Sequence, residues 1–203
     1  MIEYKFGNIF STGMNTIVCP VNTVGVMGAG LALTVKAIYP ELFKRYKEFC
    51  KAGELDIGKL YFNQGRRKNI LLFPTKKHWK DYSEISWIEE GLKKFTENIE
   101  SKGYYNTAFP MLGCGLGRAD EDKVIDLFEK YLEPYPYVFE VWKHDPDSED
   151  PVWNELYMKC ESEDTQFKRV VRECSNFYEL SRYPGVGKDT FGKNVNSLLR
   201  YEC

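Results

Sequence analysis

The sequence predicts a layered α/β fold in one main domain. Short apolar runs typical of buried strands alternate with amphipathic stretches of helical spacing. A unit of strand, glycine-rich loop and helix occurs twice, around residues 16–38 and around residues 105–131. The length of 203 residues and the hydrophobic content of 43% suit one domain with a modest extension. We therefore expect residues 1–145 to form the main domain and residues 146–203 a helical extension packed on it.

The first half of the chain is expected to supply four strands and two helices. Residues 2–5 alternate apolar and polar side chains, as an edge strand does, whereas residues 16–21 form an apolar run that suits a strand buried on both faces. Pro40 interrupts the first helical spacing, and Gly53 ends the second. The expected elements are strands at 2–5 and 16–21, helices at 31–38 and around 42–52, and strands at 59–63 and 69–73, the last two joined by a turn at 65–68.

The second half continues the alternation and ends in helices. A stripe of apolar residues from Ile85 to Ile99 predicts a long helix, and Gly103 follows where a helix commonly ends. The acidic, proline-flanked residues 144–151 are typical of a linker or exposed loop. The expected elements are a helix at 83–101, a strand at 105–111, a helix around 124–131, a strand at 137–142, one amphipathic helix at 167–178, a turn at 184–188 and a short last helix.

Composition excludes several classes of protein. The 28 Lys and Arg residues against 30 Asp and Glu residues give a net charge of −2, so any contact with nucleic acid must be local. Residues 1–5 do not resemble a signal peptide, and no apolar run approaches a membrane span, so we expect a cytoplasmic protein without membrane contact. Six cysteines without a C-x-x-C pair and two separated histidines predict reduced thiols and no metal site. No cofactor is expected.

The two glycine loops are the strongest local sign of a ligand. Ligands of layered α/β folds bind beyond the carboxyl ends of strands, and both loops lie there. Glycines can take positive φ, so that backbone N–H groups converge on an anion, and a helix N-terminus behind each loop favours phosphate. Two such loops suit a diphosphate, although tight turns before helices would give the same pattern. The glycines are Gly25, Gly28 and Gly30 in the first loop and Gly113, Gly115 and Gly117 in the second.

Neither loop matches a common nucleotide fingerprint. The first lacks the G-x-x-x-x-G-K-[ST] pattern of a P-loop, and its glycine spacing differs from G-x-G-x-x-G. ATP hydrolysis and NAD-dependent redox chemistry are therefore disfavoured.

Four segments together resemble a macrodomain. They are Gly7–Phe10, Cys19–Ala32, Phe73–Trp79 and Pro110–Gly117. The pair Val-Gly-Val-Met-Gly-Ala-Gly and Phe-Pro-Thr-Lys-Lys-His-Trp is similar to the macrodomains of DNA ADP-ribosyl glycohydrolase antitoxins, a branch that also includes terminal ADP-ribose glycohydrolases acting on proteins. The resemblance covers about residues 1–143. It implies a three-layer α/β/α fold with a central mixed sheet of about six strands.

The resemblance also implies where ADP-ribose would bind. Asn8, in a position that is usually Asp, would accept a hydrogen bond from the adenine amino group, and Ile9 would offer its backbone N–H. Asn22 would hydrogen-bond the distal ribose. The diphosphate would lie between Val26, Met27, Gly28, Ala29 and Gly30 on one side and Leu112, Gly113, Cys114, Gly115, Leu116 and Gly117 on the other.

Lys76 matches the lysine to which this branch assigns catalysis. An ammonium beside a diphosphate would steer the ligand and balance its charge, and a partly desolvated amine of lowered pKa would attack C1″ of the ribose. A solvated basic cluster with Lys77 and Lys80 is the other interpretation. The register at the end of the strand decides which of the adjacent lysines faces the ligand.

One position departs from the protein-directed relatives. They carry Asp after Gly-Cys-Gly-Leu, where this chain has Gly117, and the absence of that carboxylate favours the DNA-directed branch. Asp120 could replace this carboxylate as a base, although an acidic first turn of a helix is the simpler and more common explanation of Asp120. Cys114 has no histidine nearby in the sequence and is interpreted as structural.

Residues around the lysine leave two further choices open. Trp79 would either stack on an unpaired base or pack against Ile85 or Trp87. The basic runs Arg66–Lys68 and Lys76–Lys80 would either form a rim that contacts phosphates or be solvated surface.

Together these observations predict an ADP-ribosyl glycohydrolase that removes ADP-ribose from a nucleobase of DNA. Its expected partners are ADP-ribose and ADP-ribosylated DNA, it is expected to be a monomer, and a toxin partner is left open. The alternatives are a binding module for ADP-ribose or a related signalling nucleotide, and an ADP-ribose 1″-phosphate phosphatase. The fold alone does not separate these functions.

Overall fold

A mixed sheet of six strands forms the centre of the molecule, as predicted. The structure, a computed structural model, describes residues 1–161 and 164–201. The strands are β1 (Ile2–Phe6), β2 (Thr16–Asn22), β3 (Tyr61–Asn63), β4 (Asn69–Lys76), β5 (Thr107–Pro110) and β6 (Phe139–Lys143), in the order β1-β6-β5-β2-β4-β3. Among the strands of the described residues, only β3 runs antiparallel to its neighbour. The carboxyl ends of the other five therefore lie at one edge of the sheet.

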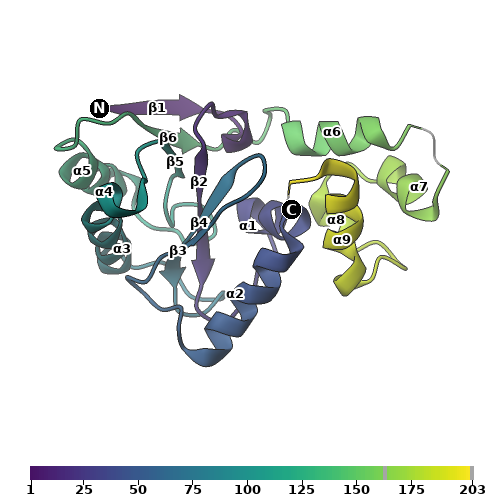
Figure 1. Ribbon diagram of the computed structural model, residues 1–203, viewed down its shortest axis with the longest axis horizontal. Helices are drawn as coiled ribbons and strands as arrows, with labels where there is room; N and C mark the ends of the chain where they lie inside the picture. The colour runs from purple at the N-terminus through teal and green to yellow at the C-terminus, as the bar shows by residue number, and fades with distance from the viewer. Residues whose placement is uncertain (162–163, 202–203) are drawn as a thin grey trace.

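Helices cover both faces of this sheet (Figure 1). On one face lie α1 (Gly30–Ile38) and α2 (Pro40–Ala52), and on the other lie α3 (Ile85–Glu97), α4 (Ile99–Lys102) and α5 (Glu121–Leu132). Successive side chains of β2 pack on opposite faces of the sheet. Ile17 and Cys19 pack in the core beneath α1 and α2, whereas Val18 packs beneath α3 and α5. The three-layer α/β/α architecture is confirmed.

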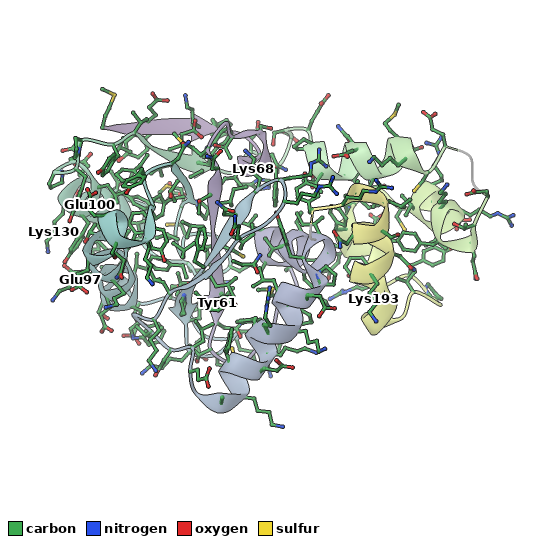
Figure 2. The ribbon with its side chains drawn as sticks, viewed as in Figure 1. Tyr61, Lys68, Glu97, Glu100, Lys130 and Lys193 are labelled. Atoms are coloured by element: carbon green, nitrogen blue, oxygen red, sulfur yellow. The ribbon has the colours of Figure 1, made fainter. Side chains whose placement is uncertain are left out.

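The described part of the C-terminal segment adds four helices on the α1 side of the sheet (Figure 1). They are α6 (Pro151–Lys159), α7 (Gln166–Glu173), α8 (Phe177–Leu180) and α9 (Lys188–Leu199). Their buried residues, such as Leu156 and Val195, belong to the same apolar core as Val35 of α1. At Gly192 a Cβ would lie 2.9 Å from Pro40 Cβ, so α9 approaches α2 closely. Figure 2 shows Lys193 on this extension, on the side of the molecule away from Glu97 and Lys130. The division into domains at residue 145 stays a prediction.

Three helical expectations were wrong in detail. The helix expected over 83–101 is divided at Asn98, where ψ is 1°. The helix expected over 167–178 is divided at Cys174, where ψ is 157°, because Asn176 caps a new helix by accepting a hydrogen bond from Glu179 N. Helix α6 was not predicted. Its start signal, Asp150 accepting from Val152 N and Trp153 N, lies at the end of the segment that resembled a linker.

The described cysteines form no disulfide. Five cysteines are free among the described residues, and Cys203 lies outside them. No helix in the described part of the chain combines the length and apolarity that a membrane crossing requires.

Candidate active site

A β-bulge at the end of β4 determines how Lys76 is presented. Val21 pairs with Pro74, but the next residue of β2, Asn22, pairs with Lys76, so Thr75 is an extra residue in β4. Side chains alternate along a strand, and one inserted residue changes which face the following side chain takes. The strand was expected to end at Phe73. Its extension and the bulge bring Lys76 beside Asn22 at the carboxyl edge of the sheet.

The two adjacent lysines point to different partners. Lys76 Nζ donates a hydrogen bond to Leu116 O at 2.7 Å and so spans the distance from β4 to the second glycine loop. Lys77 Nζ instead lies 5.3 Å from the centre of the Trp87 ring. Partial burial lowers the pKa of Lys76, and the nearby charge of Asp81 opposes this shift. Lys76, not Lys77, is therefore the amine held against the glycine loop.

Asn22 holds the first glycine loop in place. Its Oδ1 accepts hydrogen bonds from Val24 N and Val26 N, both at 3.2 Å, and its Nδ2 donates to Val26 O at 2.7 Å. The buried Tyr46 hydroxyl donates to Asn22 O at 2.7 Å and fixes the strand end from below. The Asn22 Nδ2 carries two hydrogens, so the expected hydrogen bond to the ribose would use the hydrogen that is not donated to Val26 O. Sequence reasoning missed the part played by Tyr46.

The first loop has the backbone that an anion site needs. Gly25 and Gly30 take φ values of 79° and 53°, whereas Gly28 does not require a positive φ. Met27 is 2% exposed and anchors the middle of the loop, while Gly28 faces solvent and Ala29 is partly exposed. No side chain caps α1 at Ala29, so the first N–H groups of this nine-residue helix are open to a ligand.

The second loop differs from the expectation in two ways. Of its three glycines only Gly113 has positive φ, at 73°, and the residue that follows the loop, Arg118, has φ of 53°. Helix α5 begins only at Glu121, and the Asp120 carboxylate accepts from Asp122 N and Lys123 N. The expectation that this loop opens directly into a helix is wrong, and the Asp120 carboxylate already accepts hydrogen bonds from N–H groups at the start of α5. Asp120 thus acts as a helix cap, which favours the simpler of its two interpretations.

Gly117 is closely enclosed. A Cβ at this position would lie 2.2 Å from Gly113 O and 2.3 Å from Ser83 Oγ. Ser83 is buried, its N–H donates to Gly117 O at 2.9 Å, and its Oγ has no partner among the described residues. This conformation of the loop excludes any side chain at Gly117, the Asp of protein-directed relatives included. Nothing in the sequence marks Ser83 as a neighbour of this loop.

Asn8 and Ile9 follow β1 at the same edge of the sheet. The Asn8 side chain accepts a hydrogen bond from Phe10 N at 3.0 Å and caps a short 3-10 helix, η1 (Ile9–Ser11), and Ile9 is 8% exposed. Four strand spacings separate β1 from β4, which amounts to about 19 Å. A ligand that reached from Asn8 to Lys76 would have to be elongated and lie across the strand ends.

Two other sequence-derived candidates have structural roles. Burial, with Glu121 and Asp120 nearby, raises the pKa of the Cys114 thiol to about 11, so it is a poor nucleophile. The basic run at residues 66–68 does not join Lys76 in one rim. Lys68 Nζ donates to Thr12 O and Met14 O at 2.8 and 2.6 Å, and it lies at the start of β4 (Figure 2), about 25 Å of strand from Lys76.

Comparison with known proteins identifies the family of the fold. A family model described as Macro domain matches residues 18–128. The chain is 39% identical over 145 residues to a DNA ADP-ribosyl transferase-DNA ADP-ribosyl glycohydrolase fusion protein of Thermosipho africanus, and 35% identical over 150 residues to a DNA ADP-ribosyl glycohydrolase of Thermus aquaticus. These matches cover 62% and 72% of this chain but only 37% and 41% of the relatives. The chain thus spans about two fifths of the length of these curated relatives.

Solved structures give the same result. The macrodomain of Mycobacterium tuberculosis DarG matches with a TM-score of 0.67 and 36% identity, over 71% of this chain and 98% of that one. Thermosipho africanus DarTG in complex with ADP-ribose matches with a TM-score of 0.64 and 35% identity, over 73% of this chain and 43% of that one. The family match extends over more than half of the chain, and its residues include both glycine loops and Lys76. The chain therefore belongs to the macrodomain family.

Proposed function

We propose that this chain hydrolyses the N-glycosidic bond between ADP-ribose and a nucleobase of DNA. The observation that carries the proposal is the position of Lys76, whose Nζ donates to Leu116 O at 2.7 Å beside the two glycine loops. The activities for which the relatives are named support the reaction, and the Thermosipho africanus structure, which is a complex with ADP-ribose, supports that ligand. The enclosed Gly117 supports DNA over protein as the carrier, because a carboxylate cannot be accommodated there.

The ligand is proposed to lie across the strand ends. Its adenine would meet Asn8 and Ile9, and its distal ribose would meet Asn22. Its diphosphate would lie between two backbone segments, where converging N–H groups and the open N-terminus of α1 stabilise negative charge. The proposed lining residues are Val26, Met27, Gly28, Ala29 and Gly30 in the first loop, and Leu112, Gly113, Cys114, Gly115, Leu116 and Gly117 in the second.

Lys76 has two chemically distinct ways to act. As a neutral amine it would attack C1″, forming a C1″–Nζ bond as the bond to the base breaks, and the lost amine proton would pass to the leaving base. Water would then displace the lysine and release ADP-ribose. As an ammonium it would only hold the diphosphate while water attacks C1″. Partial burial lowers the pKa of Lys76 and favours the amine role, which we adopt.

A binding module is the second candidate function. It is favoured by the same Gly117, because no carboxylate at that position can act as a general base. Such a module would hold ADP-ribose without releasing it from any carrier.

The test is a parallel incubation with three substrates. Mono-ADP-ribosylated oligonucleotide, ADP-ribosylated protein and ADP-ribose 1″-phosphate are each mixed with the protein, and released ADP-ribose or phosphate is measured by chromatography. We expect release from the oligonucleotide alone. Calorimetric binding of ADP-ribose without release from any substrate would overturn the proposal and identify a binding module, and phosphate release would indicate the phosphatase.

A further inference from the structure

Two large aromatic side chains are exposed next to Lys76. Trp79 is 49% and Tyr82 60% exposed, and both lie in the turn between β4 and α3. About half of the Trp79 side chain is therefore free to meet a ligand, as its expected stacking on an unpaired base requires. A cation accompanies each ring. Lys80 Nζ lies 5.1 Å from the Trp79 ring centre, and the Arg118 guanidinium lies 5.1 Å from that of Tyr82.

The turn that carries these aromatics is fixed at both ends. At its start, Thr23 Oγ1 donates to Lys77 O at 2.8 Å, and at its end Ser83 N donates to Gly117 O at 2.9 Å. Asp81 N donates to His78 O at 3.1 Å, which closes a turn with Trp79 and Lys80 at its tip. Hydrogen bonds to both glycine-loop regions thus hold the exposed rings close to Lys76.

Arg118 links the turn to the second glycine loop. Its Nη1 donates to the Tyr82 hydroxyl at 3.0 Å, and its φ of 53° is unusual for a residue other than glycine. Its guanidinium reaches across to the aromatic turn, over the Tyr82 ring. The pair forms a bridge on the surface, next to the loop that accepts the Lys76 hydrogen bond.

We propose that Trp79 and Tyr82, with Lys80 and Arg118, bind unpaired nucleotides that flank the base carrying ADP-ribose. The exposed faces of bases stack on such rings, and nearby cations contact the phosphates. Paired bases keep their faces inside the stack, so the surface fits a single strand and not a duplex. An acidic protein surface would use the cations but would leave the two rings without a function. Because the net charge of the whole chain is −2, electrostatic attraction for nucleic acid must come from local cations such as Lys80 and Arg118.

This inference rests on the proposed function only for the modified nucleotide, so it can be tested with unmodified nucleic acid. Fluorescence anisotropy would measure the Kd of the protein for a labelled oligonucleotide of about 12 nucleotides. Single-stranded DNA, single-stranded RNA and duplex DNA would be titrated separately. Trp79→Ala should raise the Kd for the single strand about 5- to 100-fold, and Trp79→Phe should restore most of the affinity. The affinity for free ADP-ribose should not change.

Tyr178 provides a matched control. It is 44% exposed on α8 and carries the Arg182 guanidinium 4.0 Å from its ring centre, so Tyr178→Ala removes a similar pair outside the site. We expect this variant to bind the single strand like wild type. Three results would each overturn the inference. They are equal affinities of Trp79→Ala and Tyr178→Ala for the single strand, binding of duplex DNA as tight as that of the single strand, and no binding by the wild-type protein.

The two proposals fail in different ways. If Trp79-dependent binding of the single strand is found but no ADP-ribose is released from any substrate, the surface is supported and the hydrolase is not. If ADP-ribose is released from DNA but Trp79→Ala leaves both the Kd of the single strand and the KM unchanged, the surface is refuted and the hydrolase is supported. Similar affinities for RNA and DNA support the surface, because stacking does not depend on the sugar.

Discussion

Gly117→Ala should deform the second glycine loop, whereas Gly115→Ala should leave it intact. The added Cβ at Gly117 would lie 2.2 Å from Gly113 O and 2.3 Å from Ser83 Oγ, but a Cβ at Gly115 would meet no atom within 4 Å. Ordinary contacts of carbon atoms are about 3.5–4.0 Å. The loop must therefore move by more than about 1 Å to accept the methyl group, and the hydrogen bond from Ser83 N to Gly117 O is placed at risk.

The expected cost follows from these contacts. Overpacking costs about 1–3 kcal/mol, and loss of one hydrogen bond adds about 1 kcal/mol. We expect Gly117→Ala to lower the free energy of unfolding by about 1–4 kcal/mol, with a fall in Tm of about 2–4 °C for each kcal/mol in a chain of this size. Urea unfolding gives the first quantity and calorimetry the second. The Kd for ADP-ribose should rise because the loop backbone is displaced.

A second variant separates the two contacts. Ser83→Ala in the Gly117→Ala background removes the Oγ contact but leaves the backbone contact with Gly113 O, so it should recover only part of the loss. For the same reason Gly117→Asp should damage the loop instead of creating a protein-directed enzyme. The reasoning is refuted if Gly117→Ala matches Gly115→Ala in both stability and affinity for ADP-ribose.

Three shorter predictions concern the site and the extension. Burial lowers the pKa of Lys76, and the neutral amine is the attacking form. The kcat should therefore rise with pH and level off at a pH below 10.5, the ordinary pKa of a lysine. A kcat that falls as the pH rises towards 10.5 would assign the reaction to the ammonium. Asp120→Asn should keep both the cap of α5 and the rate of ADP-ribose release. Asp120→Ala should lower the free energy of unfolding, measured with urea, by about 1 kcal/mol and leave the release rate unchanged. A slower release by Asp120→Asn would show that Asp120 acts as a base. Arg67 Nη1 donates to Glu155 Oε2 at 2.6 Å and to Leu199 O at 3.3 Å. Arg67→Ala should therefore lower the free energy of unfolding by about 1 kcal/mol and speed the exchange of amide hydrogens in α9. Unchanged exchange would show that the C-terminal extension does not depend on Arg67.

Periodicity was sufficient for the sheet and the main helices because their apolar faces are continuous. The buried run in β2 and the stripe in α3 each face a core that the sequence pattern already implies. The breaks in the helices depend on local capping. Asn98 and Asn176 each stand at a break inside a pattern that still looked helical, since apolar spacing continues on both sides.

The site was predictable as a set of residues but not as a geometry. The resemblance identified Lys76, but the bulge that separates it from Lys77 arises from the pairing of β4 with β2, which a single strand does not encode. The second helix N-terminus was misjudged because residues 118–120 separate loop from helix and Asp120 caps it. Ser83 and the bridge between Tyr82 and Arg118 join segments distant in sequence, and no local pattern signals such contacts.

Lys76 and Lys77 offer the most direct test of the central proposal, because they are chemically identical and adjacent but contact different partners. Single-turnover release of ADP-ribose from a modified oligonucleotide would be measured for Lys76→Ala and Lys77→Ala. We predict a loss of at least about 100-fold for Lys76→Ala and a rate close to wild type for Lys77→Ala. Equal rates for the two variants, or a greater loss for Lys77→Ala, would contradict the assignment of the reaction to the amine that reaches the second glycine loop.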